Sequence, residues 1–316
     1  MRPLIPAPAE PVAAGDIRRT MQQMASEVVG RQRELEMVLA AVACGRDLLL
    51  EGPPGTGKTT LLRAITRAWG IPLLLVEGNA ELTPGRLVGH HDPARVLQEG
   101  FTADTFEPGP LVRAMQEGGF LHFEEFNRAP EDTLNTLLTA IADREITIPR
   151  YGTVQASDTF RVVGSMNPHD NVGTTRLSVS IKDRLCRLVL DYQDEATERE
   201  VVALRTGADV DEVLARRLVE DATAVTRTTR GHDQVRQGSS VRGAIDLQLL
   251  AARVCEIRGI EDPEDERYRL TFFDAMLVAL TGRMVLDEAT DATPESVLRD
   301  IWESYFIIDP ATARPG

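Results

Sequence analysis

In the first part of the chain, short apolar runs alternate with longer segments whose apolar residues recur every three or four positions. The short runs are typical of buried strands, and they lie at 47–51, 71–76, 120–123, 160–165 and 188–192. The longer segments are typical of amphipathic helices, and they lie at 16–27, 30–44, 60–69, 82–88, 110–117 and 130–143. Strands that alternate with helices in this way predict a parallel sheet covered by helices, which is an α/β fold.

Two places in this alternation hold paired short segments that predict β-hairpins. The first hairpin pairs 93–97 with 101–106 across a polar turn that ends in glycine. The second hairpin pairs 145–148 with 153–155 around Tyr151 and the glycine that follows it. The loop of the second hairpin is a candidate contact for a substrate, and a plain surface hairpin fits the pattern nearly as well.

The pattern becomes helical after the last predicted strand. We therefore predict a core domain at 16–192 and a smaller all-α lid domain at 193–316. The helices of this lid are separated by breaks near Gly207, 231–238 and 261–266. Residues 1–15 are rich in proline and alanine, and we expect them to form a disordered leader.

The composition narrows the classes of function. The chain has 35 lysines and arginines against 49 acidic residues, a formal net charge of −14. This balance argues against broad, non-specific binding to nucleic acid, which needs a basic surface. Three widely spaced cysteines predict reduced thiols, and no apolar run approaches the length of a membrane span. We therefore expect a cytoplasmic protein with no membrane partner.

The run after the first predicted strand matches the phosphate-loop pattern G-x-x-x-x-G-K-[ST] at every required position. Its residues are Gly52, Pro53, Pro54, Gly55, Thr56, Gly57, Lys58 and Thr59. The loop's backbone N–H groups and the N-terminus of the next helix attract phosphate oxygens. Lys58 reaches the β- and γ-phosphates, and Thr59 can ligate Mg²⁺. The alternative is a turn that binds nothing, which the flanking strand and helix disfavour.

Two carboxylates, Glu124 and Glu125, close the apolar run at 120–123. A phosphate-loop enzyme needs one acid to hold Mg²⁺ and a second to polarise the attacking water. Adjacent acids at the end of a strand are otherwise commonly part of a solvated turn. Because the phosphate loop precedes them, we predict the functional role.

Three more residues are candidates for contact with the terminal phosphate. Asn167 follows the strand at 160–165 and could orient the water, or it could support the turn before the next proline. Arg184 precedes the last predicted strand and could reach the nucleotide of a neighbouring subunit, or it could form a surface ion pair with Asp183 or another acid. Arg242 opens a predicted lid helix and could contact the same phosphate.

These motifs together resemble the MoxR group of AAA+ ATPases, with the CbbQ/NorQ and gas-vesicle GvpN branches as near relatives. The resemblance covers about 27–192 well and the lid more loosely. It rests on these segments in one order and spacing: Val28-Val29-Gly30-Arg31-Gln32, the phosphate loop, Glu124-Glu125-Phe126-Asn127-Arg128-Ala129-Pro130, Met166-Asn167-Pro168 and Asp183-Arg184. The Asn-Arg-Ala-Pro run is rather specific to this group.

The resemblance implies a P-loop AAA+ core with two inserted β-hairpins, followed by the lid, and it assigns roles. Lys58 and Thr59 become Walker A residues, and the acid pair becomes Walker B, with Glu124 in place of the family's aspartate. Asn167 becomes sensor 1. Arg184 becomes the arginine finger, and Arg242 becomes sensor 2. The segment with Val29 and Gly30 joins the phosphate loop and Thr60 in the predicted nucleotide site.

The function that follows is that of a Mg²⁺-dependent ATPase that binds ATP and assembles as a ring, expected to be a hexamer. Such a protein would remodel or activate a partner protein, and by resemblance that partner often carries a von Willebrand A domain. One alternative is a nucleic-acid-directed motor or a restriction or defence subunit, which the acidic charge disfavours. Another is a weakly hydrolysing, nucleotide-gated assembly module, which Glu124 would favour.

The histidines add no metal site to this prediction. His90, His91 and Asp92 are adjacent, but no second cluster shows the spacing of zinc ligands. His122 lies within a predicted strand, and we expect it to be a packed core residue.

Overall fold

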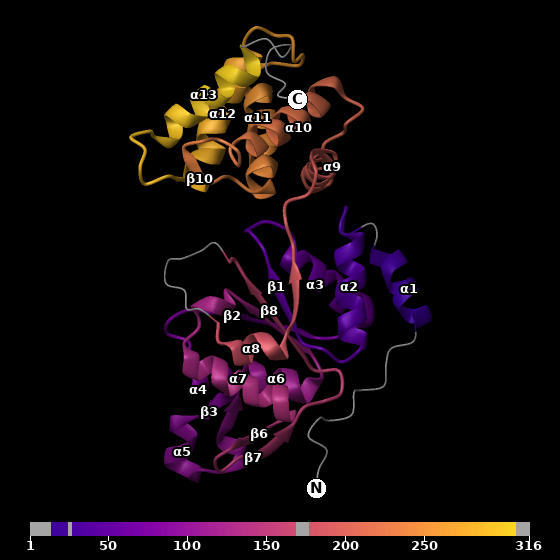
Figure 1. The fold of residues 1–316 in the computed structure, drawn as a ribbon, viewed down its shortest axis with the longest axis vertical. Coiled ribbons are helices and arrows are strands. Elements are labelled where there is room, and N and C mark those ends of the chain that lie inside the picture. The colour runs from indigo at the N-terminus through magenta and orange to yellow at the C-terminus, as the bar shows by residue number, and fades with distance from the viewer. Residues whose placement is uncertain (1–13, 25–26, 169–176, 308–316) are drawn as a thin grey trace. The chain divides into compact units, whose positions relative to one another are not determined.

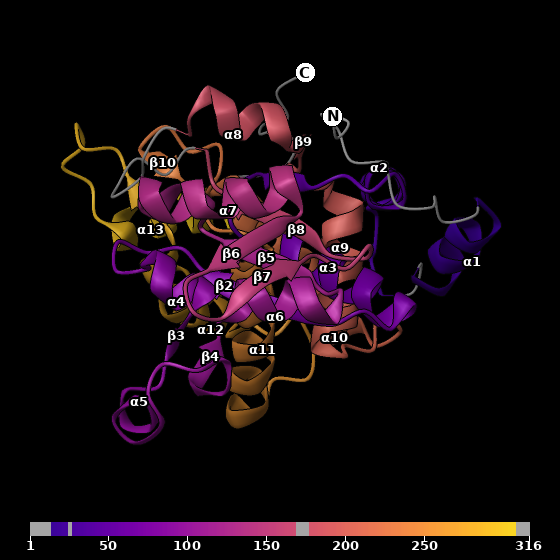
Figure 2. The ribbon, with the colours of Figure 1, turned by 90° about the horizontal axis from the view of Figure 1, so that it is seen from below.

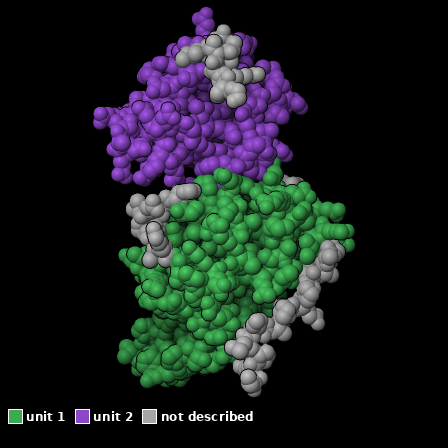
Figure 3. Space-filling view, in the orientation of Figure 1, with its two compact units in different colours: residues 1–53, 57–191 green, residues 54–56, 192–316 purple. Residues whose placement is uncertain are grey.

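The computed structural model describes residues 14–24, 27–168 and 177–307, and it divides into two compact units. The first unit comprises 1–53 and 57–191, and the second comprises 54–56 and 192–316, as Figure 3 shows in two colours. The segment 1–15, predicted to be a disordered leader, lies almost entirely outside the described residues. No helix among the described residues is long and apolar enough to cross a membrane.

The first unit is built on a five-stranded sheet in the order β2-β5-β8-β1-β9. All neighbouring strands in it are parallel, as the sequence predicts. The strands are β1 (Leu48–Glu51), β2 (Leu73–Glu77), β5 (Phe120–Glu124), β8 (Arg161–Met166) and β9 (Cys186–Val189). Since the strands are parallel, their carboxyl ends lie at one edge of the sheet, where ligands of open α/β sheets bind.

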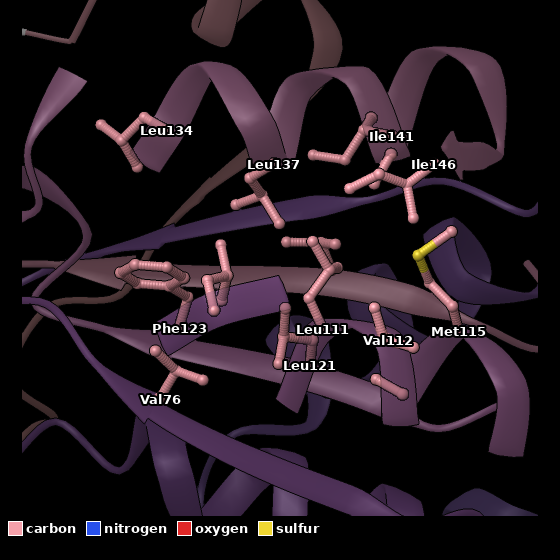
Figure 4. Packing of buried hydrophobic residues seen from close by; sticks show 14 of the residues in the cluster. Val76, Leu111, Val112, Met115, Leu121, Phe123, Leu134, Leu137, Ile141 and Ile146 are labelled. Carbon is pink, nitrogen blue, oxygen red and sulfur yellow. The ribbon is translucent and has the colours of Figure 1, made fainter. Parts of the chain in front are cut away.

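Helices cover both faces of this sheet (Figure 1). One face packs against α2 (Gln32–Ala43) and α3 (Lys58–Trp69), and α1 (Ala14–Met24) packs on these two helices. The other face packs against α4 (Pro84–Val88), α6 (Pro110–Glu117), α7 (Glu131–Asp143) and α8 (Val179–Arg184). Figure 4 shows Leu134, Leu137 and Ile141 of α7 directed at Leu121 and Phe123 of β5. Alternate residues of each strand therefore supply two separate apolar cores.

The first insertion differs from the predicted hairpin. Its strands are β3 (Gly89–His91) and β4 (Phe106–Pro108), and the helix α5 (Pro93–Glu99) lies between them, at the tip of the insertion in Figure 2. The predicted strand at 93–97 is wrong because Asp92 caps a helix there. Its side chain accepts a hydrogen bond from the Ala94 N–H at 2.8 Å, and proline at the first helical position favours the helix.

The second hairpin is confirmed. Strand β6 (Glu145–Ile148) pairs with β7 (Gly152–Gln155) in antiparallel register. The two insertions also contact each other through aromatic side chains. The rings of Phe106 and Tyr151 lie 4.5 Å apart, and the Arg150 guanidinium lies 4.4 Å from the centre of the Phe101 ring. Such contacts restrict the motion of one insertion relative to the other.

The second unit is helical, as predicted, with one addition. Its helices are α9 (Glu195–Thr206), α10 (Val213–Thr228), α11 (Val241–Arg258), α12 (Tyr268–Leu280) and α13 (Pro294–Phe306). Two short strands, β10 (Val235–Gln237) and β11 (Val285–Leu286), form an antiparallel ribbon that the sequence analysis did not predict. The large side chains of Tyr268, Phe272 and Trp302 fill the core of this unit.

Candidate active site

The phosphate loop joins the carboxyl end of β1 to the N-terminus of α3. Gly57 precedes the helix in a left-handed conformation with φ 86°, which a residue with a side chain rarely adopts. The Lys58 ammonium donates to the carbonyl oxygens of Gly52, at 2.7 Å, and Pro53, at 2.9 Å. The lysine head is therefore held over the loop, where the terminal phosphates of a bound nucleotide would be contacted.

The side chains of Thr59 and Glu124 meet although they lie on different elements. The Thr59 hydroxyl, in the first turn of α3, donates to Oε1 of Glu124 at 2.5 Å. Glu124 is the last residue of β5 and is half-buried. A hydroxyl and a carboxylate that converge in this way supply the oxygen ligands that Mg²⁺ prefers, so the residues present fit the ion.

Glu125 follows in a left-handed backbone conformation with φ 52°, an uncommon state for a residue with a side chain. Its Oε2 lies 3.2 Å from Nε of Arg128, which forms an ion pair with it. The end of β2 passes close by, because the Gly78 N–H donates to the carbonyl oxygen of Glu124 at 2.8 Å. A Cβ on Gly78 would lie 2.3 Å from the Glu125 carbonyl oxygen, so glycine is required at this approach.

A polar group also connects the interior of the sheet to this site. His122 is fully buried on β5, and its Nε2 lies 3.1 Å from the Ser165 hydroxyl on β8. Burial lowers the pKa of His122 to about 4, so the imidazole is neutral at physiological pH. Beyond β8, the carbonyl oxygen of Asn167 accepts a hydrogen bond from the Asn127 amide at 3.4 Å. This contact ties the segment after β8 to the segment after the acid pair.

Arg184 lies at the opposite end of the sheet. It ends α8 and precedes β9, whose first residue, Cys186, pairs with Leu48 at the start of β1. The Arg184 guanidinium is exposed and donates to the carbonyl oxygen of Ser180 at 3.0 Å and to its hydroxyl at 2.7 Å. Arg184 is therefore separated by the length of β1 from the phosphate loop of its own chain.

The remaining predicted residues lie in two places. Val29 is half-buried and Gly30 is exposed, with φ 66°, in the turn before α2, while Thr60 is half-buried on α3. Arg242 is exposed on the second unit, in the first turn of α11. Its backbone N–H donates to the Ser240 hydroxyl at 3.3 Å, which caps that helix.

Sequence reasoning missed three residues that contact the acid pair or lie beside it: Gly78, His122 and Arg128. Arg128 lies in the Asn-Arg-Ala-Pro run that carries the resemblance, so its position could have been found. The only sequence signal at Gly78 was a glycine close to the end of a predicted strand. His122 was predicted to be core, which its burial confirms, but no local pattern indicated its partner on β8.

The fold and the site together define a class of protein. A glycine-rich loop links strand β1 to a helix, and the strand that carries the acid pair is separated from β1 by one strand, β8. All the parts of the first unit that would contact a nucleotide's phosphates, apart from Arg184, lie at the carboxyl edge of the sheet. This is the arrangement of a P-loop ATPase.

Comparisons with known proteins narrow this class. A family model described as AAA domain (dynein-related subfamily) matches residues 47–185. The denitrification regulatory protein NirQ of Pseudomonas aeruginosa is 32% identical over 262 residues, which cover 82% of this chain and 91% of NirQ. The gas vesicle ATPase GvpN of Ancylobacter aquaticus is 26% identical over 294 residues, which cover 88% of this chain and 79% of GvpN.

Solved structures agree in fold. The Holliday junction branch migration motor RuvB of Thermotoga maritima superposes with a TM-score of 0.53 at 18% identity, covering 82% of this chain and 73% of RuvB. At that identity the likeness shows the fold alone. The chain belongs to the AAA+ ATPases, in the MoxR-like group to which NirQ and GvpN also belong. It is thus a nucleotide-binding protein with ATPase activity.

Proposed function

We propose that this ATPase works as a ring of six subunits, depends on Mg²⁺, and uses ATP turnover to remodel or activate a partner protein. The observation that carries the proposal is the position of Arg184. Lys58, Thr59, Glu124 and Glu125 gather at the carboxyl edge of the sheet, whereas Arg184 is exposed near its amino end. An arginine so placed serves a nucleotide only if a second subunit docks against it.

Each residue then has a role in the proposed reaction. Thr59 and Glu124 hold Mg²⁺, which when bound offsets the charge of the β- and γ-phosphates. Lys58 binds the same phosphates. Glu125 polarises the attacking water, and for this its carboxylate must leave the ion pair with Arg128. The Arg184 of the neighbouring subunit stabilises charge that develops in the transition state.

The client is proposed to be a protein in the cytoplasm. GvpN is named as a gas vesicle ATPase and NirQ as a denitrification regulatory protein, so these two relatives are named for different processes. By family resemblance, a partner with a von Willebrand A domain is the first candidate. The tip of the first insertion offers an apolar contact for it, since Leu97 is 88% exposed and Phe101 is 53% exposed. A partner that contacts the tip of the first insertion, away from the active site, would explain why this segment projects from the core.

The decisive experiment mixes two variants, Arg184→Ala and Glu125→Gln. Each variant should bind ATP and lose most of its turnover. Mixed rings should regain turnover, because some shared sites then combine an intact Glu125 with an intact neighbouring Arg184. Lys182→Ala is the matched control, since it removes an exposed cation from the same short helix and should keep wild-type turnover.

Two results would contradict the proposal. If mixed rings form, as shown by co-purification of two differently tagged variants, and remain inactive, Arg184 does not act between subunits. If turnover per subunit stays constant over a wide range of protein concentration while the particle remains a monomer, the ring is not needed. Stimulation by DNA in the same assay would instead favour a nucleic-acid-directed motor.

A further inference from the structure

The imidazole of His122 lies between the proposed metal-binding carboxylate and the neighbouring strand. His122 and Glu124 are two residues apart on β5, so their side chains point to the same face of the sheet. The Nδ1 atom of His122 lies 3.7 Å from Oε1 of Glu124, and Nε2 lies 3.1 Å from the hydroxyl oxygen of Ser165. Both His122 and Ser165 are buried, at 0% and 4% exposure. The three side chains form one continuous polar path within the sheet.

The charge of Glu124 selects one tautomer of the neutral ring. A neutral imidazole has one N–H and one nitrogen lone pair. If Nδ1 carries the hydrogen, it points an N–H at the carboxylate, and the Ser165 hydroxyl donates to Nε2. The other tautomer would point a lone pair at a carboxylate, which is repulsive. The Ser165 hydroxyl can act as donor or acceptor with either tautomer, so the Glu124 carboxylate determines which tautomer is favoured.

The geometry shows that Nδ1 has not completed this contact. Among the described residues, Nδ1 of His122 is a buried nitrogen that has no hydrogen-bond partner, because 3.7 Å exceeds hydrogen-bond length. An unsatisfied buried donor is costly and calls for an explanation. A shift of the Glu124 carboxylate toward the ring by less than 1 Å would satisfy it. The Thr59 hydroxyl already donates to the same oxygen, Oε1.

We propose that His122 is a positioning residue for the metal site, and that it orients the Glu124 carboxylate through an Nδ1–H donor, while the Ser165 hydroxyl donates to Nε2 and holds the ring in place. Two donors, from His122 and Thr59, then hold Oε1 and turn the other oxygen toward the ion. Outer partners of this kind orient the ligands of metals and tune affinity. The path also connects the acid to β8, the strand that ends next to Asn167. This inference rests on the proposed Mg²⁺ site of Thr59 and Glu124.

The test separates the two nitrogens of the ring by substitution. His122→Asn keeps an N–H donor near the position of Nδ1 and loses the contact with Ser165. His122→Gln reaches the position of Nε2 and loses the donor to Glu124. His122→Leu loses both. The probe is Mn²⁺, titrated into protein with bound ADP and followed by electron paramagnetic resonance, so the readout does not require turnover.

We expect His122→Gln and His122→Leu to weaken Mn²⁺ binding by about 10-fold or more, as loss of an outer partner typically does. His122→Asn should stay within about 3-fold of wild type. ADP affinity without metal should not change in any variant. His91→Gln is the matched control, since His91 also contacts a side-chain hydroxyl, that of Thr105 at 3.0 Å, but lies in the first insertion. It should leave Mn²⁺ binding unchanged.

Unchanged Mn²⁺ binding in His122→Gln, or an equal loss in His122→Asn and His122→Gln, would overturn the role of Nδ1. If a His122 variant does not fold, as judged by thermal melting, Ser165→Ala replaces it. Ser165→Ala removes the hydroxyl that contacts Nε2 of His122, so the ring is no longer held in place and Mn²⁺ binding should weaken. A Mn²⁺ affinity equal to that of the wild type would overturn the proposal. If wild-type protein with ADP binds no Mn²⁺, the proposed metal site itself is wrong, and this result is distinct from the others.

Discussion

Asp47 lies just before β1, where its carboxylate is buried and feels the charges of nearby arginines. The residue is 7% exposed, and its Oδ1 accepts the Val162 N–H at 2.6 Å. Burial raises the pKa of Asp47 to about 6 from 3.8, although the Val162 hydrogen bond and the charges of Arg144 and Arg161 oppose the rise. The folded protein therefore binds a proton at Asp47 more tightly than the unfolded chain does.

This shift predicts the sign and the size of a pH effect on stability. Because the folded-state pKa lies above the unfolded value, the free energy of unfolding falls as the pH rises from about 4 to about 6. A shift of about two units corresponds to about 3 kcal/mol over the whole range. Asp47→Asn keeps an oxygen for the Val162 N–H but does not ionise. Relative to the parent protein, the variant should gain about 2 kcal/mol between about pH 4.5 and about pH 8.

Urea unfolding followed by tryptophan fluorescence would measure this difference. The chain has two tryptophans, Trp69 in the first unit and Trp302 in the second. In a Trp302→Phe background, Trp69 reports the first unit alone. Asp158→Asn is the matched control, because Asp158 is exposed and also lies near both arginines. The difference in unfolding free energy between Asp158→Asn and its parent should change little with pH. A constant difference between Asp47→Asn and its parent at all pH values would refute the reasoning.

Three further predictions concern the active site and the insertions. Lys58→Ala should lower ATP affinity by about 10- to 100-fold in calorimetry, whereas Lys182→Ala should not, and equal affinities would contradict the phosphate-loop role. Glu125→Gln should bind ATP normally but turn over at least about 100-fold more slowly, and full turnover would mean that another group polarises the water. Phe101→Ala removes the ring that stacks with a guanidinium of the second hairpin, so amide exchange in β6 and β7 should become faster. Leu97→Ala, which truncates an exposed side chain of α5, should not have this effect.

Much of the fold could be predicted from the sequence because local signals agreed with the global arrangement. Apolar runs marked the strands, and helix ends carried their usual residues. Gly70 ends α3 in a left-handed conformation, and Pro110 begins α6. The first insertion could not be predicted from periodicity, since a stretch as short as 93–97 fits a strand or a helix equally well. The capping interaction of Asp92 decided the outcome, and an aspartate followed by proline is a helix-start signal that the sequence contains.

The active site, like the fold, could be predicted from the sequence only in part. Most site residues that belong to a motif or follow a strand were predicted, because backbone topology alone brings the ends of the strands to one edge of the sheet; Gly78 and Arg128 were the exceptions. Contacts between side chains on different strands were not predicted. The bond between His122 and Ser165 joins positions 43 residues apart, and only the register of β5 against β8 places them together. The ion pair of Glu125 with Arg128 depends on a left-handed residue at the start of a short turn, which sequence patterns do not reveal.

The glutamate at position 124 shows how such contacts change the interpretation of a motif. From the sequence alone, the extra methylene relative to the family's aspartate raises doubt about metal binding. In the structure, the longer side chain reaches α3, because the Thr59 hydroxyl lies 2.5 Å from Oε1. An aspartate on the same backbone would end about 1.5 Å short of that position. The side-chain length is thus matched to this site, and Glu124 need not be read as a defect in an otherwise intact ATPase.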